Sequence, residues 1–303
     1  MATGAGPAAS FSQYAAEAGL TRMSAPIEPP VIGNPWAQLR RFTAARIALG
    51  RAGISLPTQP QLAFQLAHAQ ARDAVHLALD VERLLQDVRD ARLLPANECV
   101  VLHSAAANRL EYLQRPDLGR RLNQASVEQL KTLAQASSAD RFDIAFVLAD
   151  GLSALAVAQN AVPLMVSVFG LLAAVNYRIA PLSIVRQGRV AVGDEVAALL
   201  GARLVVLLIG ERPGLSSPDS LGAYLTSAPA VGLTDASRNC VSNIRPAGLK
   251  FDDAAHKIYY LVTEMMRREL SGVALKDESQ GLQIGGQPMQ PNFLLEGNCQ
   301  GDR

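Results

Sequence analysis

The sequence predicts an α/β protein in which helices cover both faces of a parallel sheet, preceded by a helical segment. From residue 126 onward, aliphatic runs alternate with helical patterns, as in a sheet buried on both faces. Residues 34–124 instead show helical periodicity. The chain has 303 residues, 49% of them hydrophobic and only 5% aromatic, so we expect one large or two modest domains with a core of Ala, Val and Leu.

Charge and cysteine content exclude several classes of protein. Twenty-eight basic and 27 acidic residues give a net charge of +1, so no overall field favours nucleic acid or an anionic membrane. The three cysteines (Cys99, Cys240 and Cys299) form no CxxC pair, and the four histidines show no metal-binding spacing, so we expect a reducing compartment and no metal site. The first residues lack the pattern of a secretory signal, which favours a cytoplasmic location.

The amino-terminal third is predicted to be a flexible lead-in followed by helices. Residues 1–33 are rich in Ala, Gly and Pro; within them "FSQYAAEAGL" fits either a frayed end or a docking or targeting peptide. We expect one helix over 36–49, closed by Gly50, and a second long helix over 61–88. The arginine-rich turn "RPDLGRRL" follows at 115–122.

Strands and helices then alternate. The first helix, 126–135, has Ser126 as its predicted cap, and the apolar strand 142–151 ends in Asp-Gly. The uncharged stretch 151–177 is long enough to span a membrane. Because Gln159-Asn160 and Pro163 interrupt it and strands flank it, we expect a buried helix instead.

The remaining elements complete the predicted sheet. Strands are expected at 182–192 and 202–212, separated by a helix over 194–201 that Gly201 closes. Shorter strands follow at 220–227 and 239–244, then an amphipathic helix over 252–270. The Gln-, Gly- and Pro-rich residues 275–303 are expected to be a flexible tail.

Three predicted strand ends are polar, and these indicate a ligand site. They are Asp150-Gly151, Gly188-Arg189-Val190 and Gly210-Glu211-Arg212. In open α/β sheets, ligands bind beyond the carboxyl ends of the parallel strands. The dinucleotide, P-loop and nucleophile-elbow motifs are all missing, so these residues alone do not identify the ligand.

Structural roles remain open for the same residues. Asp150-Gly151 is compatible with a simple turn and cap, Glu211-Arg212 with a local ion pair, and Cys240 with an inert buried thiol.

Five stretches resemble the small subunit of ethanolamine ammonia-lyase, a family of adenosylcobalamin-dependent enzymes. They occur in the family's order and cover roughly residues 34–270. The stretches are "LRRFTAARIALGRAG" (39–53), "YLQRPDLGRRL" (112–122), "ADGLSA" (149–154), "GRVAVGDEVAALLGARLVVLLIGERPGL" (188–215) and "DASRNCVSNI" (235–244). The first 33 residues, "LPANECVVLHSAAANR" and the tail depart from the family pattern.

The resemblance implies a fold and a division into domains. A flexible segment (1–33) would precede a helical domain (34–124), a Rossmann-like cobalamin-binding domain (125–274) and a flexible tail (275–303). The family's partner is a large TIM-barrel subunit that binds ethanolamine, and cobalamin lies between the two subunits. The complex converts ethanolamine to acetaldehyde and ammonia by radical chemistry.

The resemblance also assigns residues. The family's cobalamin contacts fall on Val190, Glu211 and Cys240, with Arg189, Arg212 and Asn243 beside them. No DxHxxG loop is present, which agrees with base-on adenosylcobalamin. We expect no catalytic acid or base in this chain, no nucleic-acid or membrane partner, and a subunit contact at "RPDLGRRL".

Two alternatives belong to other classes. One is a stand-alone nucleotide-binding enzyme, which the missing glycine fingerprint disfavours. The other is a structural protein of an ethanolamine-metabolising bacterial microcompartment that has lost cofactor binding. The retained GRV, GER and NC elements disfavour it, although a location of the lyase subunit inside such a compartment stays open.

Overall fold

The computed structural model describes residues 34–93, 99–136 and 141–278, which fall into two compact units divided between Ala63 and Phe64. The expectations for residues 1–33, for Cys299 and for most of the 275–303 tail lie outside the described residues.

The helix predicted over 36–49 is shorter than expected. A 3-10 helix, η1, covers Pro35–Arg41, where the Asn34 side chain accepts a hydrogen bond from the backbone N–H of Trp36. Ala48 and Gly50 then have positive φ angles of 51° and 78°, which a helix cannot accommodate. No residue of η1 is buried, and a short helix without a packed face has little to sustain it.

The long helix predicted over 61–88 is two helices. α2 spans Thr58–His76 and α3 spans Val81–Asp90. Asp80 separates them, because its carboxylate accepts a hydrogen bond from the backbone N–H of Arg83 at 3.0 Å. This is an N-cap, so the chain begins a new helix here.

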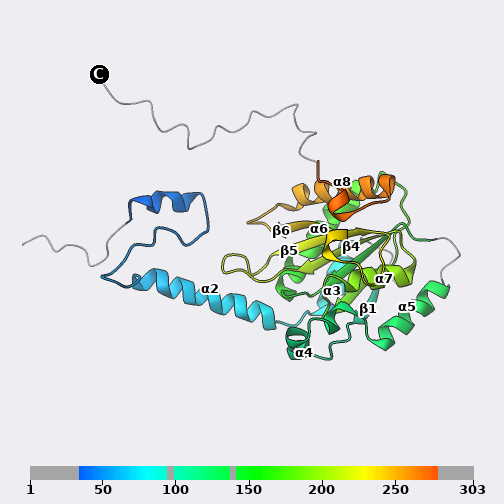
Figure 1. Cartoon of the computed structure of the whole chain (residues 1–303), viewed down its shortest axis with the longest axis horizontal. Helices are drawn as coiled ribbons and strands as arrows, with labels where there is room; N and C mark the ends of the chain where they lie inside the picture. Colours follow the sequence, from blue (N-terminus) through cyan, green and yellow to red (C-terminus); the bar gives the residue numbers. More distant parts are fainter. Residues whose placement is uncertain (1–33, 94–98, 137–140, 279–303) are drawn as a thin grey trace, which may run out of the picture. The chain divides into compact units, whose positions relative to one another are not determined.

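The sheet has six strands in the order β1-β3-β2-β4-β5-β6. Figure 1 shows β4, β5 and β6 running side by side. The strands are β1 Cys99–His103, β2 Ile144–Ala149, β3 Leu182–Arg186, β4 Leu204–Gly210, β5 Leu221–Ser227 and β6 Asn239–Ile244. The first four in the sheet are mutually parallel, whereas β5 is antiparallel to both of its neighbours. The sheet is therefore mixed rather than fully parallel. The links on either side of β5 contain no long helix, and a parallel crossover needs a longer connection.

β1 comes from the segment that the sequence pattern predicts to be helical. Val101 of β1 lies opposite Ile184 of β3, and burial alternates along the strand. The structure thus shows a mixed α/β fold in which residues 99–103 belong to the sheet. The Rossmann-like assignment and the domain boundary at 124/125 stay predictions.

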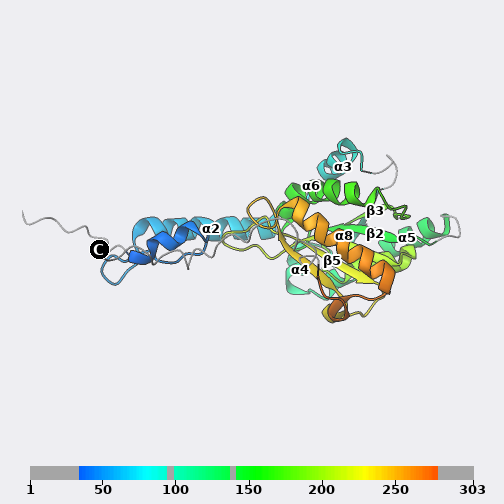
Figure 2. The same ribbon diagram turned by 90° about the horizontal axis from the view of Figure 1, so that it is seen from above.

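Helices cover the two faces of the sheet, as predicted. α3, α6 (Ala154–Leu172) and α8 (Phe251–Arg268) cover one face, and α6 and α8 lie side by side (Figure 2). α5 (Gln124–Ala136) and α7 (Val192–Leu200) cover the other. Short elements complete the fold, namely α4 Arg109–Gln114, η2 Leu118–Arg120, η3 Asp235–Ser237 and η4 Gly272–Ala274.

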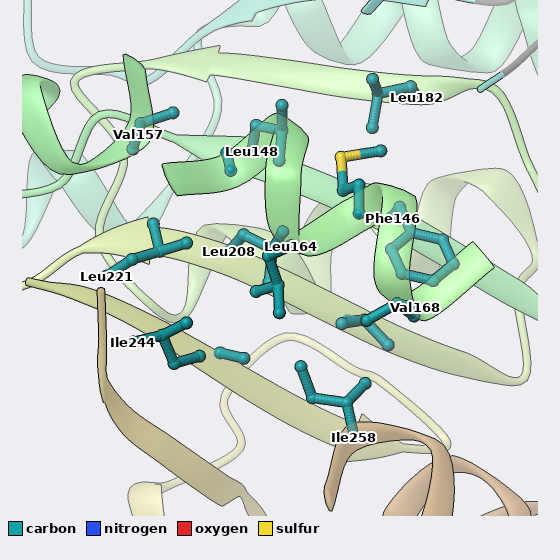
Figure 3. Packing of buried hydrophobic residues seen from close by; sticks show 14 of the residues in the cluster. Phe146, Leu148, Val157, Leu164, Val168, Leu182, Leu208, Leu221, Ile244 and Ile258 are labelled. Atoms are coloured by element: carbon teal, nitrogen blue, oxygen red, sulfur yellow. The ribbon is translucent and has the colours of Figure 1, made fainter. Parts of the chain in front are cut away.

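Successive residues of β2 supply both cores. Phe146 and Leu148 pack against Leu164 and Val168 of α6 on one face (Figure 3), while Val147 belongs to the core on the other face. All six residues of β2 are buried. Because each fully buried Leu, Val or Phe contributes about 1.5–3 kcal/mol, these two cores hold the strand ends in place.

α6 is the uncharged helix that raised the question of a membrane. Among the described residues it alone is long and apolar enough to cross one, judged by length and composition. Leu164, Met165 and Val168 of α6 belong to the core between this helix and the sheet. This is the buried position that we expected for the helix. Ser153 caps its first turn by accepting a hydrogen bond from the N–H of Ala156 at 3.2 Å.

Of the two caps predicted in the part of the chain that forms the sheet and its helices, Ser126 is wrong and Gly201 is confirmed. Ser126 lies inside α5, where Asn123 accepts the hydrogen bond from its backbone N–H. The Ser126 hydroxyl instead accepts from the backbone N–H of His103, joining α5 to β1. Gly201 ends α7 in the left-handed conformation, with φ of 69°.

Candidate functional site

An open pocket of about 370 Å³ lies at the carboxyl ends of the parallel strands. The loop after β2 leads to α6 on one face, and the loop after the adjacent β3 leads to α7 on the other. Such a divergence leaves a crevice at the strand ends. The lining residues are Tyr112, Gly151, Leu152, Arg189, Val190, Ile209, Gly210, Glu211, Arg212 and Tyr224.

Two glycines allow the strand ends to meet at this pocket. Gly151 has a φ of +57°, and a Cβ placed on it would lie 2.2 Å from the carbonyl oxygen of Gly210. A Cβ on Gly210 would lie 2.0 Å from the carbonyl oxygen of Ser153. The backbone N–H of Leu152 donates to the Gly210 carbonyl at 2.9 Å. The end of β4 and the turn after β2 are therefore in direct backbone contact, which only glycine permits.

Glu211 is held in a fixed orientation beside the pocket. Its Oε2 accepts hydrogen bonds from the Ser220 hydroxyl at 2.5 Å and from the backbone N–H of Asn243 at 3.2 Å. Its own backbone N–H donates to the Ser220 carbonyl at 2.9 Å. The carboxylate thus joins the ends of β4 and β6.

Arg212 does not pair with Glu211, so the local ion pair considered above is wrong. Its side chain is exposed and makes no hydrogen bond or ion pair with any residue that the structure describes. A cation thus stands at the pocket rim beside an oriented carboxylate.

Tyr112, a buried residue that lies between two arginines, also lines the pocket. The ring of Tyr112 lies 4.7 Å from the guanidinium carbon of Arg109 and 4.3 Å from that of Arg189. Its hydroxyl donates to the Gly188 carbonyl at 3.2 Å. Burial raises the pKa of Tyr112 far above its ordinary value, so the phenol stays protonated. Cation–π contacts of this kind fix the Arg189 side chain at the pocket.

Asp150 is buried behind the pocket and does not line it. Its two carboxylate oxygens accept from the backbone N–H groups of Gln187 and Gly188, at 2.9 and 3.0 Å. Burial raises its pKa, while these bonds and Arg109, whose Nη1 lies 4.0 Å away, act in the opposite direction. Asp150 therefore positions the loop that carries Val190. The simple turn and cap considered from the sequence does not describe this role in full.

Cys240 lies on β6, opposite Tyr224 of β5. The residue is exposed, so it is not the buried thiol considered above. Partial desolvation nonetheless raises the pKa of the thiol, and a hydrogen bond with Tyr224 lowers it. Tyr224 lines the pocket and Cys240 contacts it from the next strand.

Four of the residues singled out in the sequence line the pocket together, namely Arg189, Val190, Glu211 and Arg212. The other two lie beside it: Asn243 bonds to Glu211, and Cys240 contacts Tyr224. Sequence reasoning missed Arg109, Tyr112 and Tyr224. Tyr112 opens the "YLQRPDLGRRL" stretch and Tyr224 lies in a predicted strand, but neither pattern signals a pocket wall.

The "RPDLGRRL" segment packs within the chain. Arg121 forms two hydrogen bonds with the Glu195 carboxylate, at 2.8 and 3.1 Å. The Gly119 carbonyl accepts from the backbone N–H of Arg189 at 2.7 Å. The segment therefore supports the pocket wall, and its role as a subunit contact stays a prediction.

No group of three His, Cys, Asp or Glu side chains that could hold a metal ion occurs in the described part of the chain. The fold and the pocket together define the class as a mixed α/β protein with a candidate ligand site at its parallel strand ends. Comparison with known proteins then gives the family.

Residues 33–276 match the model of the ethanolamine ammonia-lyase light chain (EutC) family. The chain is 56% identical over 267 residues to the ethanolamine ammonia-lyase small subunit of Azotobacter vinelandii, covering 88% of this chain and 97% of that protein. The small subunit of Pseudomonas putida strain KT2440 is 58% identical over 269 residues, with the same coverage. The chain belongs to the ethanolamine ammonia-lyase small-subunit family, which confirms the resemblance, and it is a component of a lyase complex.

Proposed function

We propose that this chain binds adenosylcobalamin at the strand-end pocket, at an interface with a large TIM-barrel subunit. The resulting complex would convert ethanolamine to acetaldehyde and ammonia by radical chemistry. Membership of the family supports this proposal, and the observation that carries it is the oriented Glu211 carboxylate in an open pocket at the carboxyl ends of the strands.

The chemistry of the pocket fits a corrin edge. Cobalamin carries amide side chains that both donate and accept hydrogen bonds around an apolar ring. Glu211 offers a fixed acceptor, Arg212 offers donors, and Val190 and Leu152 offer apolar surface. Gly151 and Gly210 expose backbone to a ligand. The pocket is open and smaller than the cofactor, so a second protein surface is needed to cover the remainder.

The residues of this chain bind and orient. Val190, Glu211 and Cys240 are the proposed cobalamin contacts, supported by Arg189, Arg212 and Asn243. When bound, adenosylcobalamin supplies the carbon–cobalt bond whose homolysis starts the radical chemistry. None of the four histidines lines the pocket, which agrees with a base-on cofactor. We assign no catalytic acid or base here, because Asp150 is occupied in positioning a loop.

Ethanolamine would be bound by the large subunit. We further propose a cytoplasmic location, with a bacterial microcompartment as the alternative that residues 1–33 would decide. Deleting those residues and following co-sedimentation with the shell tests the second location.

Reconstitution tests the activity. The purified chain is mixed with the large subunit, adenosylcobalamin and ethanolamine, and acetaldehyde should form only when both proteins are present. Full activity from the large subunit alone would contradict the proposal.

Substitution of Glu211 tests the site. Glu211→Ala should raise the Kd for adenosylcobalamin in the reconstituted complex about tenfold, because one charge-assisted hydrogen bond is worth roughly 1.5–3 kcal/mol. Glu211→Gln keeps an acceptor for Ser220 and should have a smaller effect. The matched control is Glu82→Ala on the exposed surface of α3. Equal Kd values for Glu211→Ala and the control, measured by equilibrium dialysis, would remove Glu211 from the site.

A further inference from the structure

Large apolar side chains are exposed at unusual density near the start of the described chain. Eight of the thirteen exposed large apolar residues in the described ranges lie between residues 36 and 66, and the other five are scattered. The eight are Trp36, Phe42, Ile47, Ile54, Leu56, Leu62, Phe64 and Leu66. An exposed apolar group of this kind marks an interaction surface.

The same segment has almost no core of its own. Between residues 34 and 63, Pro57 is the one buried residue. η1 has none, and Ile54 is fully exposed. Because ordering a residue costs about 1–2 kcal/mol of backbone entropy, such a segment needs contacts from outside itself to keep one conformation.

All charged side chains of the segment are cationic, and none lies beyond residue 51. No Asp or Glu occurs between Asn34 and Leu66, whereas four arginines do, at positions 40, 41, 46 and 51. Arg40, Arg41 and Arg46 line a groove of about 490 Å³ whose other walls include Leu49 and Ala63. Charge complementarity therefore requires a partner surface rich in carboxylates around an apolar centre.

The directions of the side chains favour a protein partner over a membrane. Leu62, Phe64 and Leu66 lie on α2 at intervals of two residues, and at 3.6 residues per turn Leu62 and Phe64 project to nearly opposite sides. A membrane-surface helix has its apolar residues on one face. Apolar residues on several sides of one helix are covered only by a surface that encloses it.

We propose that residues 34–66, the docking segment, bind the large lyase subunit in an acidic, apolar-centred cleft of that subunit. This inference rests on the proposed function, since it takes the large subunit as the partner. It assigns the main contact with the large subunit to the docking segment. The arginine-rich turn at 115–122 instead supports the pocket wall through its hydrogen bond to Arg189.

Paired variants of the full chain test the docking segment. Arg40→Glu with Arg41→Glu reverses two exposed charges, and Trp36→Ala with Ile54→Ser removes two exposed apolar groups. Each pair should raise the Kd for the large subunit at least about tenfold, the effect of losing one or two interface anchors. The wild-type Kd should also rise with salt, and the charge-reversed pair should lose that dependence. Sedimentation-velocity titration measures all of these.

The controls carry the same chemical changes elsewhere on the surface. Val231→Ser with Val273→Ser removes two exposed apolar groups, and Arg89→Glu reverses one exposed charge on α3. These variants should bind within about twofold of the wild type, because surface positions outside an interface contribute little to binding. Circular dichroism should show that all variants fold.

The outcomes separate the two proposals. If the wild-type chain does not associate with the large subunit, the proposed function fails. If it associates but the docking-segment variants bind as tightly as the controls, the docking inference alone fails. The isolated chain is also tested for binding to a second copy, to anionic lipid vesicles and to RNA. If the docking-segment variants lose one of these interactions but still bind the large subunit, the docking inference is likewise overturned.

Discussion

At the carboxyl end of β4, two glycine backbones lie closer together than any side chain would allow. Gly210 follows the last aliphatic residue of the strand, and a Cβ there would overlap the Ser153 carbonyl. This contact places the amide and carboxylate of Glu211 at the pocket edge. The glycine before Glu211 is therefore required by the fold, and the pocket depends on it.

Substituting glycine should have opposite effects at two positions. Gly210→Ala should lower the free energy of unfolding by more than about 2 kcal/mol, because the strand end or the turn after β2 must move. A methyl group on Gly170, inside α6, would meet open space, so Gly170→Ala should stabilise the protein by about 0.5–1 kcal/mol. Urea unfolding of both variants gives the two values. Equal effects would show that the backbone contact at Gly210 is looser than the structure indicates.

Between elements, a buried ion pair connects α7 to the segment before β6. Arg238 pairs with Asp194, and both side chains are 3% exposed. Arg238 also donates to Asp235 at 2.9 Å and to the Leu233 carbonyl at 3.0 Å. Val190 lies just before α7, which carries Asp194, and Cys240 lies two residues after Arg238. The Arg238–Asp194 ion pair therefore fixes the positions of these two proposed cobalamin contacts relative to each other.

Breaking the pair should cost more than replacing it. Arg238→Met leaves the Asp194 carboxylate buried without its partner and should lower the free energy of unfolding by about 3–5 kcal/mol. Adding Asp194→Leu removes the buried charge and should recover a large part of that loss. Urea unfolding of the two single variants and the double variant measures the coupling. Strictly additive losses would mean that the two side chains do not interact.

In the molecule as a whole, the packed core belongs to the unit that begins at Phe64. The two core clusters contain residues from Leu79 onward, and none from the first unit among the residues that the structure describes. The described residues of the first unit therefore contribute no side chain to these two core clusters.

A chain that begins at Thr58 and keeps α2 whole should consequently fold. We expect its free energy of unfolding to lie within about 1 kcal/mol of that of the full chain, because residues 34–57 bury only Pro57. Urea unfolding followed by circular dichroism checks this. A loss of the cooperative transition would show that the first unit contributes to the core.

The order of the main elements and the polar strand ends can be derived from the amino-acid sequence alone. The aliphatic runs of β2, β3 and β4 and the helices between them are predictable because local periodicity reports burial directly. The residues after these strands are expected at one edge, since parallel strands end at the same side of a sheet. Family membership, too, can be inferred from the sequence.

Which polar groups meet is known only from the way the elements pack together. Asp80 interrupts a helical pattern, and β1 leaves a helical region to pair with β3, because capping and strand pairing outweigh local propensity. Contacts between residues distant in the chain place Tyr112 and Tyr224 at the pocket. Such contacts also orient Glu211, whose Oε2 accepts hydrogen bonds from Ser220 and Asn243. Periodicity shows which face of an element is buried, but it does not show which element packs against that face.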